Sequence, residues 1–259
     1  MRVRLLGDFE LTVDGRPATA WHGQLGPALV KYLLAQRRRA CARDVLLEQF
    51  WPGVDPDVAR NRLHVALSGV RRALATVTDA ALVEFCDGFY RIAPVHEVET
   101  DVERFRALIE AGRSAEIDDR LEEAAALYRR AAATYTGDFL ADSPYDDWTM
   151  LPREELRMAY VDLLDRWSDV LAAAGRESEC VEVGRLLLRE DPCREDVHRL
   201  IMRCHARFGR TSEALRQYER CRRALRETLG LEPSAPTQAL ASSLRERVPL
   251  LPTAQLSYS

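Results

Sequence analysis

The sequence has 259 residues, of which 47% are hydrophobic and 30% charged, and its formal net charge is −4 at pH 7. This composition is that of an ordinary folded protein and excludes a disordered or fibrous chain. The length favours two domains. The first residues, MRVRLLGDFELTVDG, alternate instead of forming a signal-peptide block, and no run of about 18 apolar residues occurs, so we expect a cytoplasmic protein without membrane contact.

The segment up to Trp21 predicts a small antiparallel sheet, because apolar and polar residues alternate on both sides of a tight turn at Asp14-Gly15. A helical stripe of leucines in LGPALVKYLLAQ predicts a first helix. A second helix is predicted in CARDVLLEQFWP, ending at Trp51-Pro52 because proline cannot continue it.

A third helix is predicted from Asp57 to Ala75, with Asp55 or Asp57 available as its N-cap. Its apolar residues recur at i, i+4, i+7 and i+11, which places them on one stripe of a helix: Leu63, Leu67, Val70 and Leu74. After it, ALVEFCDGFYRIAP predicts a hairpin around Asp87-Gly88. The order of sheet, three helices and hairpin is that of a winged helix-turn-helix, which we place at residues 1–96 and in which the third helix faces the DNA groove.

The outer face of this third helix carries polar groups, arginines and one methyl-bearing side chain, the set that contacts base edges and phosphates in a major groove. This face has Asn61, His64, Val65, Ser68 and Arg72, with Arg62 on one flank and Arg60 and Arg71 nearer the core edge, and all eight are candidate DNA contacts. We expect Val65 to meet a thymine methyl group and the arginines to meet phosphates or a guanine. Outside this helix, we expect phosphate contacts from Arg37, Arg38, Arg39 and Arg91. A merely solvated face is the alternative for each of these residues.

The charge along the chain is uneven. From Lys31 to Arg72 there are nine basic and four acidic residues, whereas residues 101–259 have a net charge of −5. A basic segment on an acidic chain fits one nucleic-acid face and a second region with a different partner.

From Asp101 onward helical periodicity dominates. Gly175 and Gly209 lie 34 residues apart, the tetratricopeptide period, and EAAALY repeats as EALRQY further along the chain. The unit that begins at Gly175 has Gly184 where an aromatic residue is expected. We therefore predict an all-α stack of helical hairpins at 97–248, with a long second pair inserted at 148–174, followed by a flexible tail at 249–259.

No catalytic, metal-binding or cofactor-binding pattern is found, so we expect no enzyme. The five histidines form no known motif, and His198 and His205 are better explained as packed or solvated side chains than as metal ligands. Helix capping is the expected role of the acidic cluster Asp142, Asp146 and Asp147. The six cysteines include no C-x-x-C pair and fit reduced thiols.

Seven segments in a fixed order carry a resemblance to a known family: LLGDFEL, WPGVDPDVARNRLHVALSGVRRAL, GFYRI, GDFLADSPYDDW, DPCREDVHRLIMRC, GRTSEALRQYER and LGLEPS. The chain resembles the Streptomyces antibiotic regulatory proteins, which join a winged helix-turn-helix to a bacterial transcriptional activation domain. The resemblance implies an activator of a secondary-metabolite gene cluster, such as one for antibiotic biosynthesis. It would bind direct repeats in double-stranded DNA as a homodimer or side-by-side pair and contact RNA polymerase holoenzyme. Larger relatives append a nucleotide-hydrolysing domain, but no phosphate-binding loop is present here, so we expect the short form.

Two departures from the family pattern weaken the expected DNA affinity. Gly69 stands where relatives usually have an arginine on the recognition helix, and Asp87 stands at the wing tip, where relatives often have a basic residue. The alternative function is therefore a tetratricopeptide-type adaptor that has lost sequence-specific DNA binding.

Overall fold

The structure, a computed structural model, describes residues 1–246, so the predicted tail at 249–259 lies outside the described residues. Contacts divide the described chain into two compact units, one of residues 1–106 with 134–156 and one of residues 107–133 with 157–246. This division differs from the predicted domain bounds of 1–96 and 97–248, because residues 134–156 pack with the N-terminal elements. Each unit is described by itself.

The first unit begins with a four-stranded sheet in the order β3-β2-β1-β7. Its strands are β1 (Arg2–Arg4), β2 (Glu10–Val13), β3 (Arg16–Pro17) and β7 (Glu99–Thr100). The predicted turn between β2 and β3 is confirmed, with φ of +49° at Asp14 and +81° at Gly15, as a two-residue hairpin of type I′ requires. Strand β7, which pairs in parallel with β1, was not predicted, because two residues give no alternation to detect.

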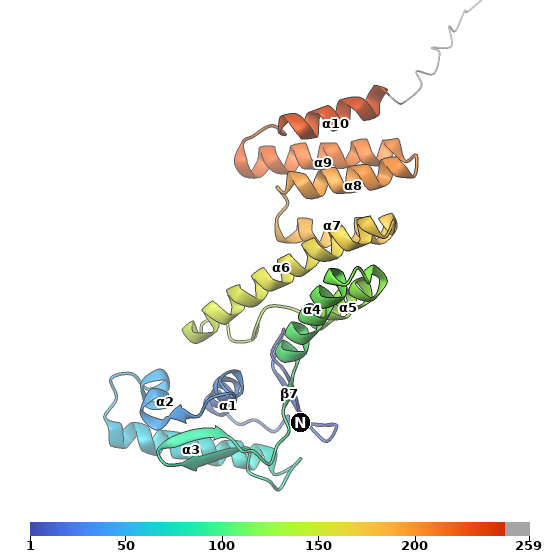
Figure 1. Ribbon diagram of the computed structural model, residues 1–259. Coiled ribbons are helices and arrows are strands. Elements are labelled where there is room, and N and C mark those ends of the chain that lie inside the picture. The colour runs from blue at the N-terminus through green and yellow to red at the C-terminus, as the bar shows by residue number, and fades with distance from the viewer. Residues whose placement is uncertain (247–259) are drawn as a thin grey trace, which may run out of the picture. The chain divides into compact units, whose positions relative to one another are not determined.

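Three helices and a second sheet complete the winged helix-turn-helix. They are α1 (Leu25–Ala35), α2 (Arg43–Phe50) and α3 (Pro56–Leu74), with β4 (Cys41–Ala42), β5 (Val83–Cys86) and β6 (Phe89–Ile92) in the sheet order β4-β6-β5. Figure 1 shows this set of elements around the labels α1, α2 and α3. The predicted α+β fold of this part is confirmed.

Residues 134–156 belong to the first unit through backbone hydrogen bonds. The Gly7 amide donates to the Asp138 carbonyl at 2.9 Å and the Leu140 amide donates to the Leu5 carbonyl at 2.7 Å.

The predicted capping role of the acidic cluster is wrong for two of its members. Asp142 forms an ion pair with Lys31, and the Asp146 side chain makes no capping hydrogen bond to the short helix η1 (Asp147–Thr149).

The second unit is built of helical hairpins. From residue 101 onward the helices are α4 (Asp101–Ile117), α5 (Leu121–Thr134), α6 (Met150–Ala173), α7 (Glu177–Glu190), α8 (Glu195–Arg207), α9 (Thr211–Leu229) and α10 (Ala235–Glu246), of which α4, α5 and α6 have residues in both units. Figure 1 shows α8, α9 and α10 stacked in order, in agreement with their contacts. The predicted helical pair at 148–174 is wrong, because α6 runs as one helix of 24 residues after η1.

The turns between paired helices repeat one geometry. Asp119, Gly175 and Gly209 have φ of +57°, +68° and +69°. After each of them an arginine amide bonds back across the turn: Arg120 to the Ala115 carbonyl, Arg176 to that of Leu171 and Arg210 to that of His205, at 2.8, 2.8 and 2.9 Å. These are Schellman caps, which favour a left-handed residue at the turn. The predicted 34-residue repeat is confirmed, with Asp119 starting the earlier copy.

The buried positions of the repeats explain why one copy lacks its aromatic residue. Tyr128 and Tyr218 occupy the aromatic position and are buried. At Gly184 a Cβ atom would lie 2.9 Å from Ile201 Cγ1, so the side chain of Ile201 on α8 fills the space that an aromatic ring takes elsewhere.

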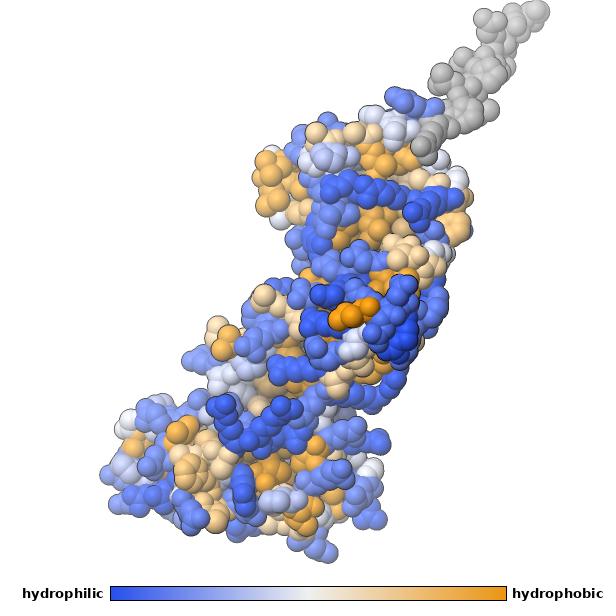
Figure 2. Space-filling view, viewed as in Figure 1, coloured by the Kyte–Doolittle hydropathy of each residue, from blue (hydrophilic) through white to orange (hydrophobic). Residues whose placement is uncertain are grey.

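Figure 2 shows hydrophilic residues over much of the visible face with smaller apolar patches between them, as expected of amphipathic helices.

Candidate nucleic-acid interface

Helix α3 is fixed at its start by local chemistry and along its length by its apolar stripe. Asp55 Oδ1 accepts hydrogen bonds from the amides of Asp57 and Val58, at 2.9 and 3.3 Å, and Pro56 occupies the first helical position. The predicted stripe is buried, which leaves the opposite face to solvent. The start and end of α3 each lie one residue from the predicted bounds.

The predicted face of α3 is presented outward. Val65 is 64% exposed and Arg60 is half-buried, and the other members are exposed: Asn61, Arg62, His64, Ser68, Arg71 and Arg72. The Ser68 hydroxyl donates to the His64 carbonyl at 2.9 Å, which leaves its oxygen lone pairs as acceptors.

The arginines of α3 differ in whether an acidic side chain neutralises them. Arg60 pairs with Asp57 at 2.9 Å. Within residues 1–246, no carboxylate lies within 4.0 Å of the guanidinium groups of Arg62, Arg71 and Arg72. These three charges are therefore available to a partner such as phosphate.

The four predicted arginines outside α3 are brought together in a surface cavity of about 330 Å³, lined by Arg37, Arg38, Arg39 and Arg91. Three of them have acidic partners. Arg37 and Arg38 both pair with Glu103, at the start of α4, and Arg91 pairs with Glu84 across the hairpin. Their charges are thus partly neutralised, which makes them weaker candidates for phosphate contacts than the arginines of α3.

The wing is the hairpin of β5 and β6, whose turn was correctly predicted. Asp87 and Gly88 have φ of +49° and +86°, and Cys86 pairs with Phe89 across the turn. The Asp87 side chain is exposed at the tip, where it would repel a phosphate.

Sequence reasoning missed Arg43, which starts α2 and binds the wing. Its amide donates to the Gly88 carbonyl at 2.9 Å, and its charge lies close enough to the Tyr90 hydroxyl to affect that group's pKa. Burial raises the pKa of Tyr90, while Arg43 and Arg71 act to lower it. In the described structure Arg43 Nε makes no hydrogen bond but forms an ion pair with Asp44 Oδ1 at 3.6 Å. One signal in the sequence could have drawn attention to Arg43: it is a basic residue in the first turn of a helix, a position that the helix dipole disfavours.

A comparison with protein-family models decides the family. The model of the bacterial transcriptional activator domain matches residues 100–245, more than half of the chain. The chain belongs to the bacterial transcriptional activator domain family. The resemblance to the Streptomyces antibiotic regulatory proteins is thereby confirmed.

Curated relatives extend the similarity of this family member beyond the matched domain. It is 28% identical over 251 residues to the regulatory protein AfsR of Streptomyces coelicolor, covering 97% of this chain and 25% of AfsR. It is 26% identical over 252 residues to the regulatory protein DnrI of Streptomyces peucetius, covering 94% of this chain and 92% of DnrI.

A solved structure shares the arrangement of elements. Mycobacterium tuberculosis EmbR, solved in complex with a low-affinity phosphopeptide, is similar with a TM-score of 0.71 at 26% identity, over 96% of this chain and 66% of EmbR. The chain thus spans a quarter of AfsR and about two thirds of EmbR. The relatives' names are those of regulators and not of enzymes.

Two further observations concern metal sites and membrane-spanning helices. Across residues 1–246, no cluster of three or more histidine, cysteine, aspartate or glutamate side chains is arranged to bind a metal ion. In the same range, no helix has the length and apolar character that a bilayer crossing requires.

Proposed function

We propose that this protein is a transcriptional activator that binds double-stranded DNA through the outward face of α3. The observation that carries the proposal is the set of three exposed arginines, Arg62, Arg71 and Arg72, that have no carboxylate partner in the described chain. Arg72 shares the face of Asn61 and Val65, and Arg62 and Arg71 flank that face on opposite sides. Base contacts from the face and phosphate contacts from its flanks would therefore come from one helix lying in a major groove.

Membership in the activator-domain family and similarity to named regulators support this function. We further propose that two copies bind side by side on direct repeats near promoters of a secondary-metabolite gene cluster. Their helical repeats would contact RNA polymerase holoenzyme, because stacked hairpins present extended surfaces suited to protein partners.

The first test is fluorescence anisotropy of the purified chain on duplexes that tile the promoters beside its gene, at roughly 50 to 200 mM salt. We expect tight binding to one duplex, with log K falling by about 0.9 per log unit of salt for each phosphate neutralised. Arg72→Gln should reduce this slope by about 0.9. The matched control, Arg216→Gln on α9, removes the same charge from the second unit and should leave the slope unchanged. No binding to any duplex at low salt would contradict the proposal.

The arrangement of two copies has its own test. Inserting five base pairs between the two halves of the bound repeat rotates them by about half a turn of DNA. Cooperative binding of the second copy should then be lost while binding to a single half remains. Run-off transcription with purified polymerase holoenzyme should rise with the protein on the original repeat and not on the altered one.

A second candidate function, an adaptor without DNA binding, is favoured by one observation. Asp87 places a negative charge at the exposed tip of the wing, and Glu103 and Glu84 already pair with Arg37, Arg38 and Arg91. If the protein is an adaptor, we expect no salt-dependent binding to any duplex in the first test. If it is a DNA-binding activator, we expect salt-dependent binding to at least one duplex.

A further inference from the structure

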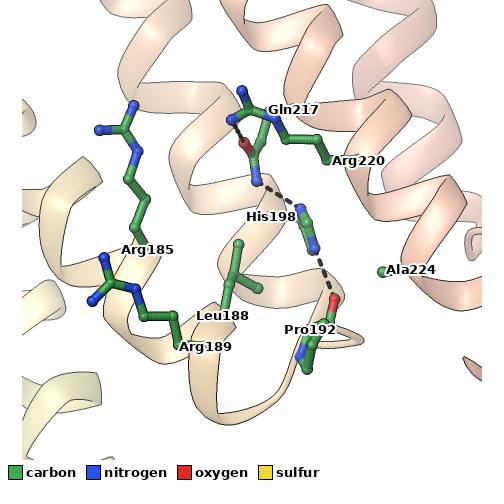
Figure 3. A pocket seen from close by; sticks show the side chains of 8 residues that line it. All are labelled: Arg185, Leu188, Arg189, Pro192, His198, Gln217, Arg220 and Ala224. Carbon is green, nitrogen blue, oxygen red and sulfur yellow. Dashed lines mark hydrogen bonds between the residues drawn. The ribbon is translucent and has the colours of Figure 1, made fainter.

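The second unit contains a basic pocket that DNA binding by α3 leaves unexplained. It has a volume of about 260 Å³ and is lined by Arg185, Leu188, Arg189, Pro192, His198, Gln217, Arg220 and Ala224. In the described chain no acidic residue lines it. Figure 3 shows Arg185 and Arg189 of α7 on one side, His198, Gln217 and Arg220 on the other, and Leu188 between them.

The charges of this pocket are only partly neutralised. Arg185 pairs with Glu182 at 2.6 Å. Among residues 1–246, Arg189 and Arg220 have no carboxylate within 4.0 Å, and both are exposed. Two guanidinium groups without acidic partners, on either side of an apolar floor, form a site for an anion that also carries an apolar group.

A chain of hydrogen bonds fixes the position of Arg220. Its NH1 donates to Gln217 Oε1 at 3.2 Å, Gln217 Nε2 donates to His198 Nδ1 at 2.7 Å, and His198 Nε2 donates to the Pro192 carbonyl at 3.0 Å (Figure 3). Because the guanidinium can only donate, Gln217 must present its oxygen to Arg220 and its amide nitrogen to the histidine. His198 Nδ1 must then accept, so the imidazole is neutral.

Burial keeps the histidine in that neutral form. His198 is 3% exposed, and burial lowers its pKa, with the charge of Arg220 acting in the same direction and Glu195 opposing it. The positive charge of the pocket therefore lies on its arginines, while His198 and Gln217 are positioning residues that hold one of them in place.

We infer that this pocket binds an acidic peptide segment of a protein partner, in which an aspartate or glutamate lies next to a large apolar residue. The carboxylate would lie between Arg189 and Arg220, and the apolar side chain would cover Leu188, Pro192 and Ala224. The volume favours one or two side chains of a peptide, because it is below the roughly 300 to 1,000 Å³ of pockets that enclose a drug-sized ligand. This inference does not depend on DNA binding by α3.

The test is an array of Gly-Ser peptides with two central positions varied through every pair of amino acids, probed with the labelled full chain. Pairs of an acidic and a large apolar residue should bind most strongly, and replacing the acid by its amide should weaken binding by roughly tenfold. Arg189→Gln with Arg220→Gln should remove this preference. The matched control is Arg216→Gln with Arg223→Gln, which removes two charges from α9 outside the pocket and should preserve it.

Four outcomes would overturn the inference. The first is a preference that survives in the Arg189→Gln, Arg220→Gln variant while circular dichroism shows it to be folded. The second is displacement of the best peptide by millimolar inorganic phosphate but not by acetate, which would make the pocket a phosphate site. The third is a lowered DNA affinity or salt slope in this variant, which would assign the two arginines to nucleic acid. An array without any preference for acidic pairs would also reject it, whatever the DNA measurements show.

Discussion

Lys31 Nζ lies 2.7 Å from Asp142 Oδ2 and 2.9 Å from Ser143 Oγ, so the sole lysine of the chain joins α1 to a segment 111 residues away. Lys31 is 7% exposed, whereas the Asp142 side chain is 36% exposed. The ion pair is therefore asymmetric: the carboxylate can be hydrated if it loses its partner, but the ammonium group cannot.

This asymmetry predicts unequal costs for removing the two partners. Asp142→Ala should lower the free energy of unfolding by about 2–3 kcal/mol, because it leaves the buried charge of Lys31 unpaired. The loss should be somewhat smaller than for a fully buried ion pair. Lys31→Met should cost about 1 kcal/mol or less, because an apolar side chain of similar length fills the site. Urea unfolding of both variants tests this. Asp146→Ala, whose side chain makes no capping bond, is the control and should change stability by less than about 0.5 kcal/mol. Equal costs for the two partners would contradict the asymmetry.

A substitution at Val65 can separate the proposed DNA binding by α3 from folding. Its side chain is 64% exposed on α3, so Val65→Asp buries no charge and should shift the thermal midpoint very little. In a major groove the new carboxylate would face phosphates, and binding to the duplex identified by anisotropy should be abolished. Met158→Asp places the same charge at an exposed apolar position of α6 and should leave binding intact. A stable Val65→Asp protein that still binds would remove α3 from the interface.

What the sequence predicts well here is local. The start of α3 follows from Asp55 and Pro56, its length follows from the helical spacing of its apolar residues, and the wing turn follows from Asp87-Gly88. Each of these signals lies within a few residues of the feature that it specifies. The repeat could be found because each Schellman cap favours a left-handed residue, and two of these turns have a glycine, Gly175 and Gly209, 34 residues apart.

What the sequence did not predict depends on contacts between distant residues. Glu103 pairs with Arg37 and Arg38 over more than 60 residues, so a count of charges in a window around those arginines does not include the group that neutralises them. The Lys31 pair is more distant still, so the local pattern around the acidic cluster predicts capping and not this ion pair. The sequence pattern does not place Arg43 at the wing, because its contact with Gly88 depends on the pairing of β4 with β6.

Gly69 can be replaced without steric cost. A Cβ atom there meets nothing within 4 Å, and a glycine inside a helix costs about 1 kcal/mol relative to alanine. Gly69→Ala and Gly69→Arg should therefore both raise the free energy of unfolding by roughly 0.5–1 kcal/mol. Only the arginine variant should steepen the salt dependence of DNA binding, by about 0.9 in log K per log unit of salt. An arginine variant with the slope of the alanine variant would show that this position does not face phosphate.

The helical glycines of the second unit should respond in the opposite way. At Gly112 a Cβ atom would lie 2.3 Å from Tyr128 Cε1, and Tyr128 is buried with its hydroxyl bonded to Glu116 at 2.7 Å. Gly112→Ala should therefore lower the free energy of unfolding by about 3 kcal/mol, at the upper end of overpacking costs. Gly184→Ala should cost less, about 1–2 kcal/mol, because a Cβ atom there would lie 2.9 Å from Ile201 Cγ1, a milder clash that the helix propensity of alanine partly offsets. Thermal unfolding of the two variants measures the difference, and similar midpoints would contradict it.

His198 should make the second unit less stable in mild acid. Its pKa in the unfolded chain is about 6.5, and burial lowers the pKa in the folded protein. Between those two values the unfolded state binds more protons, so stability falls as the pH decreases through 6.5, by at most about 1.4 kcal/mol per pH unit. Protonation of Nδ1 would also break its bond from Gln217, which adds a structural reason for the neutral form.

Urea midpoints at pH 7.5, 6.5 and 5.5 test this dependence. His198→Gln should lower the midpoint at pH 7.5, because hydrogen bonds are lost, yet reduce the decline between pH 7.5 and 5.5. His205, whose pKa is lowered by burial and by the nearby Arg185, should account for part of the remaining decline, so the double variant His198→Gln, His205→Gln should be flatter still. The exposed His22 provides the control, since His22→Gln should leave the pH profile of the second unit unchanged. A profile that keeps its wild-type slope in the double variant would show that carboxylates, and not these imidazoles, set the acid response of the repeats.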